Sequence, residues 1–290
     1  MTFNMKRLVI FVAVLWTVCS AAQTTVSFEK IFFETYGREM KYNIQGASIA
    51  EGKLFQLHDR NKPMVVYDMA DGRFVQEIAV DTVRTWHNNT ASFSNVKYEE
   101  VDPFPLLYAS QENIREHKAV VYRIKEGEDG ALEAGIVQTI IFPEPIEMGL
   151  YYPNLALDLE AGFLYLTGFS WESWKKPERG NAVQILRFRL PSPKEGPLVK
   201  FWTKDILARY CTDFKLATQG ATIQGGKLYQ VFGMPGESCL LCTDLSTGDE
   251  VFRSELNGIP GEPEGLGVYD GHLIVSCNDG NVYRSDLIVK

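Results

Sequence analysis

The stretch QGATIQGGKLYQVF at residues 219–232 has a near copy, QGASIAEGKLFQLH, at residues 45–58. Each copy contains a short alternating strand, a two-residue turn with glycine and a second alternating strand, which together indicate a β-hairpin. One β unit that recurs at a spacing of tens of residues is typical of propellers and solenoids. The repeat therefore predicts an all-β architecture built from similar units.

The starts of the predicted first strands divide the chain into five units, and they lie at Gln45, Asn88, Asn154, Gln219 and Glu264. The third unit is expected to have its fourth strand at 198–203, followed by a helical turn at 205–210. The fifth unit has only three predicted strands before the chain ends, whereas a strand at 26–33 has no local partner. Since a closed ring removes exposed sheet edges, we expect that strand to complete the fifth unit. The predicted fold is a five-bladed β-propeller whose last blade is closed by the N-terminal strand.

The recurring Gln-Gly strand, followed by a Lys-Leu-aromatic strand, resembles the five-bladed propellers grouped with teichoic-acid-biosynthesis-C-like and phage receptor-binding proteins. The motif is carried by residues 45–58 and 219–232, and the rest of the chain matches by spacing alone. Asn88 and Asn154 depart from the Gln-Gly form. The resemblance implies a five-bladed fold and recognition of carbohydrate or of a cell surface.

The N-terminus has the features of a secretory signal peptide. Lys6 and Arg7 precede an apolar run at 8–18, and small residues lead up to Ala22. We expect cleavage after residue 22, since the run is shorter than the roughly 20 residues of a membrane-spanning helix. The alternative is a lipoprotein signal that uses Cys19. Residues 23–290 are then one exported propeller domain, periplasmic or extracellular, with no membrane span.

The mature chain is acidic. Removal of residues 1–22 leaves 27 basic and 37 acidic residues, a net charge of −10. Such a chain repels phosphate backbones, which argues against nucleic acid as a partner. The sequence contains no phosphate loop, dinucleotide fingerprint, nucleophile elbow or zinc-protease motif, so no cofactor is expected. The segment at 279–281 indicates a hairpin turn rather than a calcium loop.

Four cysteines remain after cleavage: Cys211, Cys239, Cys242 and Cys277. Their even number in an exported chain permits disulfides. Cys239 and Cys242 lie three apart in a predicted strand, however, and would point to opposite faces. A zinc site would need a second Cys or His pair at similar spacing, which is missing. We expect mostly free thiols that act as small hydrophobic groups.

The strongest candidate ligand site is the mouth of the central channel, because the first strand of every propeller blade lines that channel. The residues expected to converge there are Gln45, His87, Asn88, Asn154, Gln219 and Glu264. A ring of amide and carboxylate groups suits a hydroxyl-rich ligand. The same groups could instead only link neighbouring blades, since buried polar groups need partners in either case.

Other candidates lie in the loops on the same face. Trp171 and Trp174 stand in an otherwise charged loop and could form a wall on which a sugar stacks, or could pack down over the blade. Tyr151 and Tyr152 precede a first strand and are expected to project onto this surface. His58 ends a second strand there, and a lone histidine is more often structural than functional.

Three classes of function remain open. The first is a non-catalytic binding protein for a glycan or another small polar ligand. The second is a glycoside hydrolase or lyase, which needs two placed carboxylates, of which only Glu264 occupies a first-strand start. The third is a scaffold that binds a protein partner.

Overall fold

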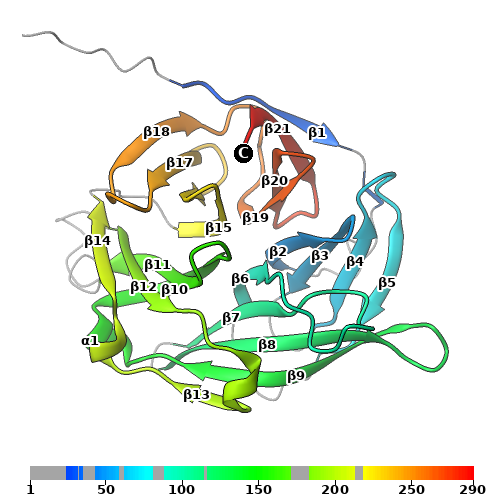
Figure 1. The fold of residues 1–290 in the computed structure, drawn as a ribbon. Coiled ribbons are helices and arrows are strands. Elements are labelled where there is room, and N and C mark those ends of the chain that lie inside the picture. Colours follow the sequence, from blue (N-terminus) through cyan, green and yellow to red (C-terminus); the bar gives the residue numbers. More distant parts are fainter. Residues whose placement is uncertain are drawn as a thin grey trace, which may run out of the picture.

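The computed structural model describes residues 24–31, 33–34, 43–58, 62–80, 88–113, 116–170, 183–212 and 218–290. Five sheets surround a central axis as the blades of a β-propeller, with one inner strand of each sheet next to the axis (Figure 1). The predicted five-bladed fold is confirmed. The described part of the chain has one short α-helix, α1 (Pro145–Met148), which precedes the inner strand of blade 3.

The blades follow the chain order, and each runs from an inner strand outward. Blade 1 consists of β2 (Ile44–Ala50), β3 (Lys53–His58), β4 (Met64–Asp68) and β5 (Phe74–Ile78). Blade 2 consists of β6 (Asn88–Phe93), β7 (Leu107–Asn113), β8 (Glu116–Glu126), β9 (Leu132–Ile141) and β13 (Leu198–Lys200). Blade 3 consists of β10 (Leu150–Asp158), β11 (Phe163–Ser170), β12 (Val183–Arg189) and β14 (Ala208–Thr212). Blade 4 consists of β15 (Thr218–Gln224), β16 (Lys227–Phe232), β17 (Cys239–Asp244) and β18 (Glu250–Glu255). Blade 5 consists of β19 (Pro263–Tyr269), β20 (His272–Cys277), β21 (Val282–Ile288) and β1 (Phe28–Ile31).

The N-terminal strand closes the ring as predicted. β1 pairs antiparallel with β21, and Phe28 lies opposite Ser285 (Figure 1). Before the strand begins, the Val26 amide donates to Ser254 Oγ at 2.8 Å, which ties the segment to blade 4 as well. The strand itself covers Phe28–Ile31 and is shorter than the predicted range. The first and last parts of the chain therefore share one sheet.

The third unit differs from its prediction. Residues 198–200 form β13, which pairs in parallel with β9 and so belongs to blade 2. The fourth strand of blade 3 is β14, in the segment expected to be a helical turn; only residues 203–205 form a short 3-10 helix. The reason is long-range, because the buried side chains of Val199 and Phe201 complete the apolar core between blades 2 and 3.

The hairpin turns explain the repeat. Between the first and second strands, Glu51 and Gly52 have φ angles of 49° and 70°, and Gly225 and Gly226 have φ angles of 55° and 68°. Two successive positive φ angles define the tight turn that matches the twist of antiparallel strands, and glycine adopts them at low cost. The glycines of the quoted stretches therefore fix the inner hairpins of blades 1 and 4.

Apolar side chains of neighbouring blades meet between the sheets. Val121 of blade 2 and Leu166 of blade 3 belong to one buried cluster, and Leu240 of blade 4 and Val275 of blade 5 belong to another. Each blade is thus covered on both faces, as strands with continuous apolar runs require. The ring has no separate core, so each blade depends on its neighbours.

The four described cysteines are free, and only Cys211 is exposed. Cys239 and Cys242 lie on β17 and join different clusters, one toward blade 3 and the other toward blade 5. The two thiols point to opposite faces of their strand, as predicted. Burial raises the pKa of Cys239 to about 12 and that of Cys242 to about 11, so both thiols stay protonated.

Candidate functional site at the channel mouth

All five inner strands carry one extra residue near their starts. The pairing of β2 with β3 passes over Gln45, and the pairing of β19 with β20 passes over Glu264. Equivalent register shifts occur in β6, β10 and β15. A β-bulge re-aims a side chain and ends regular pairing, and such bulges recur next to binding sites. Here the same irregularity occurs five times around one axis, at the end of the channel where the predicted ligand residues lie.

The structure places the candidate residues as follows. Gln45 and Glu264 are the second residues of β2 and β19 and are buried, with exposed fractions of 4% and 6%. Asn154 was predicted to start its strand, but β10 begins four residues earlier; Asn154 is 2% exposed and pairs with Thr167 beyond the bulge. Gln219 is half-buried at the start of β15. Asn88 begins β6, and its side chain is outside the described residues, as are His87, Trp171 and Trp174.

A carboxylate that the sequence interpretation missed joins blades 4 and 5 at this mouth. Glu262 accepts a hydrogen bond from Gln219 Nε2 through Oε1 and another from Asn278 Nδ2 through Oε2, each at 2.9 Å. The Asn278 backbone amide also donates to the Glu262 carbonyl oxygen at 3.0 Å. Glu262 lies two residues before Glu264, so the Glu-Pro-Glu sequence was the available signal. The result is a fixed amide–carboxylate–amide cluster, Gln219–Glu262–Asn278.

Negative charge gathers beside this cluster. Burial raises the pKa of the Cys277 thiol, and the carboxylates of Asp279, Glu264 and Glu262 raise it further. Among the residues that the structure describes, no lysine or arginine forms an ion pair with Glu262. A protonated, fully buried thiol is a poor nucleophile, so Cys277 has a packing role.

The glycine of the Gln-Gly motif serves packing between inner strands. A Cβ on Gly220 would lie 2.6 Å from the Leu266 amide nitrogen of blade 5. A Cβ on Gly265 would lie 2.5 Å from the Ala47 Cβ of blade 1. Both distances are shorter than any van der Waals contact, so the inner strands approach this closely only because the side chains are absent.

Other polar residues hold the ring together below the mouth. Gln56 of blade 1 donates to Ser276 Oγ of blade 5 at 2.9 Å, and Gln230 of blade 4 donates to Thr167 Oγ1 of blade 3 at 2.5 Å. Between blades 2 and 3, the Leu155 amide donates to Thr90 Oγ1 at 2.5 Å. Links between blades are thus made largely by residues outside the predicted ring, although Gln219 also joins two blades through Glu262.

His58 and Tyr151 have surroundings that support structural roles. The His58 Nδ1 lies 2.9 Å from the Pro63 carbonyl oxygen, and burial lowers the pKa of His58 to about 4. The Tyr151 side chain, expected on the surface, is buried and packs edge-on to His117. His117 lies on β8, so Tyr151 is enclosed between blades 2 and 3. Tyr152 is half-buried and has a φ of 48°, which is rare for a bulky residue.

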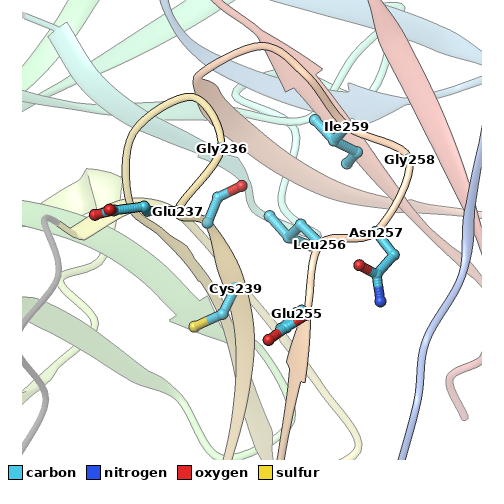
Figure 2. Close-up of a pocket in the computed structure, with 9 residues that line it drawn as sticks. Gly236, Glu237, Cys239, Glu255, Leu256, Asn257, Gly258 and Ile259 are labelled. Carbon is cyan, nitrogen blue, oxygen red and sulfur yellow. The ribbon is translucent and has the colours of Figure 1, made fainter.

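A second feature is a cavity between loops of blades 4 and 5. A cavity of about 490 Å³ separates the β16–β17 loop from the loop between β18 and β19. Figure 2 shows the two loops facing each other, with Glu237 and Cys239 on one side and Glu255 to Ile259 on the other. We call it the rim cavity. Its two charged lining residues, Glu237 and Glu255, are both acidic, and the loop that lines it continues directly to Glu262.

The described residues offer neither a metal site nor a membrane-spanning helix. They contain no group of three or more His, Cys, Asp or Glu side chains arranged to hold a metal ion. None of the helices in the described ranges has the length and apolar character needed to cross a membrane.

The comparisons with known proteins bear on the fold. No protein-family model and no curated protein matches the sequence. Among solved structures, the Myxococcus xanthus glutaminyl cyclase has a TM-score of 0.54 and 10% identity, over 92% of this chain and 99% of that chain. A putative oxidoreductase (glucose dehydrogenase) from Thermus thermophilus has a TM-score of 0.49 and 13% identity, over 90% and 99% of the two chains. The virginiamycin B lyase of Staphylococcus aureus has a TM-score of 0.47 and 12% identity, over 91% and 100%.

The five sheets around one axis define the class of protein, a single-ring β-propeller, and the likeness to the glutaminyl cyclase, at 10% identity, concerns the fold alone. The resemblance to teichoic-acid-biosynthesis-C-like and phage receptor-binding propellers stays a prediction.

Proposed function

We propose that this chain is an exported, non-catalytic propeller that binds a glycan or another hydroxyl-rich ligand at its channel mouth. The observation that carries the proposal is the Gln219–Glu262–Asn278 cluster. Its amide and carboxylate groups are held in place by one another before any ligand arrives. Pre-organised polar groups of this kind lower the cost of binding and fix the orientation of a ligand's hydroxyl groups.

The predicted ring completes the proposed site. Gln45, Asn88 and Glu264 lie within the first two residues of β2, β6 and β19, and Asn154 lies further along β10; these four inner strands surround the same axis. The proposal gives His87, Trp171 and Trp174 positions at the rim, with the tryptophans as stacking surfaces for sugar rings, whereas His58 is left with a structural role. The bulges at Gln45 and Glu264 support the proposal, because they interrupt regular pairing where a ligand would need side chains.

A glycoside hydrolase or lyase is the second candidate, and Glu262 is the observation that favours it. Together with Glu264 it gives the mouth the two carboxylates that such chemistry requires. Against this, both Glu262 oxygens already accept hydrogen bonds from amide groups, so the carboxylate serves to join blades 4 and 5. A binding role therefore fits the geometry better.

A glycan array followed by incubation of each hit with the protein tests the two candidates. We expect binding without cleavage, and loss of binding in a folded Gln219→Ala, Glu264→Ala double variant. Turnover that disappears in Glu264→Gln alone would instead establish the enzyme. Absence of any bound glycan, with capture of a protein through the same face, would favour the scaffold.

Export needs its own test. Expression with the native N-terminus in a bacterial host should give a mature protein that begins at Gln23 and is recovered outside the cytoplasm. N-terminal sequencing of the purified protein measures this directly. A lipid-modified Cys19 at the N-terminus, or an uncleaved chain, would contradict the proposal.

A further inference from the structure

The hydrogen bonds of the Gln219–Glu262–Asn278 cluster have a fixed polarity. A carboxylate accepts hydrogen bonds and donates none, so both amide side chains must turn their NH₂ groups toward Glu262. Their carbonyl oxygens, Gln219 Oε1 and Asn278 Oδ1, then remain for other partners. In this cluster the groups left for a ligand are therefore acceptors.

The charge of the cluster also favours a ligand that donates hydrogen bonds. Glu262 is held by two neutral amides, and among the described residues its negative charge has no lysine or arginine partner. It is also half-buried, which weakens screening by solvent. Glu264 and Asp279 lie close enough to act on the same thiol, Cys277. An anionic ligand would meet repulsion here.

We propose that the ligand recognised at this mouth carries a protonated primary amine, as an amino sugar with a free amino group does. This inference rests on the proposed function and narrows its ligand class. An ammonium group has three donors and no acceptor, which matches two carbonyl oxygens and one carboxylate. The ammonium group would also give the Glu262 carboxylate a positively charged partner, which the described residues do not provide. Acidic sugars and phosphorylated ligands are excluded by the same argument.

Carboxylates of the rim cavity also favour a ligand with protonated amino groups. The loop that leads to Glu262 also lines the rim cavity. The charged residues that line this cavity are Glu237 and Glu255 (Figure 2). Neither carboxylate forms an ion pair with a described residue. An oligosaccharide with several amino groups would therefore find further negative charge as it extended from the mouth toward the rim.

Calorimetry with a matched pair of probes tests the inference. Oligomers of glucosamine and of N-acetylglucosamine share a backbone and differ in whether the amine is free. We expect the free-amine oligomer to bind at least about 10-fold more tightly, the effect of one charged hydrogen bond. High salt should reduce this difference, because the contact is ionic.

Two variants connect the preference to Glu262. Glu262→Gln removes the charge with little change of shape and should abolish the difference between the two oligomers. Glu237→Gln removes an equal charge at the rim and should leave most of that difference in place. Circular dichroism and the unfolding midpoint establish that both variants fold. If Glu262→Gln does not fold, the wild-type comparison of the two oligomers still decides the question.

The outcomes separate this inference from the proposed function. Equal or tighter binding of the acetylated oligomer would overturn the amine inference and leave glycan binding standing. Binding of a sugar-free polyamine such as spermidine, dependent on Glu262 and without binding of any sugar, would support the amine inference and overturn the glycan. If neither glucosamine oligomers nor spermidine bind, the amine inference is wrong.

Discussion

Gly265 lies so close to Ala47 that a Cβ on the glycine would stand 2.5 Å from the Ala47 Cβ, across the contact between blades 5 and 1. The inner strands of a five-bladed ring converge on a narrow axis, and here they touch through backbone. The Gln-Gly and Glu-Gly sequences thus serve two purposes. The polar residue lies at the channel mouth, and the glycine lets neighbouring blades meet.

Gly265→Ala should lower the free energy of unfolding by about 1–3 kcal/mol, since the added methyl group overpacks a backbone contact. Gly135→Ala is the matched control, because nothing lies within 4 Å of its Cβ position. Chemical denaturation of both variants measures the effect. Equal stability of the two variants would show that blades 5 and 1 can separate at no cost.

Acid should destabilise the protein through His117. Burial lowers the pKa of His117 to about 4, and its Nε2 lies 3.3 Å from the Leu150 carbonyl oxygen. The folded state therefore holds this histidine neutral at a pH where the unfolded chain would bind a proton. The contribution of neutral His117 to the free energy of unfolding is fully present above about pH 6.5. It is lost as the pH falls toward 4, and the loss amounts to up to about 3 kcal/mol.

His117→Gln checks this assignment, because glutamine can still donate to Leu150 but does not titrate in this range. The difference in unfolding free energy between wild type and variant should shrink from neutral pH to about pH 4.5. Carboxylates titrate in the same window but are common to both proteins. A constant difference would contradict the buried neutral histidine.

Cysteine reactivity should separate into two groups. Cys211 is exposed, whereas Cys239, Cys242 and Cys277 are buried, and burial raises the pKa of each buried thiol. An alkylating agent should label Cys211 in the native protein and all four cysteines after denaturation without reductant. Mass spectrometry counts the labels. Two cysteines that resist labelling until a reductant is added would reveal a disulfide.

Deletion of residues 23–36 should open the ring. The deletion removes β1, the partner of β21, together with the buried side chains of Val26, Phe28 and Phe33. It exposes a strand edge and an apolar surface, so the truncated protein should aggregate in size-exclusion chromatography. A shorter deletion that ends at Thr25 should remain monodisperse. Equal behaviour of both truncations would mean that blade 5 is stable with three strands.

Much of the architecture was readable from local patterns. The glycine turns at 51–52 and 225–226, the alternating strands around them and the unpaired segment near the N-terminus predicted five blades and their closure. Hairpins are local in sequence, so short-range propensity is enough to mark them. The starts of β2, β15 and β19 were also predictable to within one residue, whereas β10 begins four residues before the predicted Asn154.

The tertiary structure decided what depends on contacts between distant residues. Residues 198–200 join blade 2 because they pair with residues 139–141, almost sixty residues earlier, and no local pattern marks that choice. The bulges in the inner strands are a property of the pairing between the first and second strands of a blade, so one strand's sequence does not reveal them. Glu262 becomes the centre of a polar cluster because Gln219 and Asn278 arrive from other strands. The sequence by itself determined the hairpins and the number of blades, whereas the partner of β13 and the contact of Gln219 with Glu262 were settled by packing between neighbouring blades.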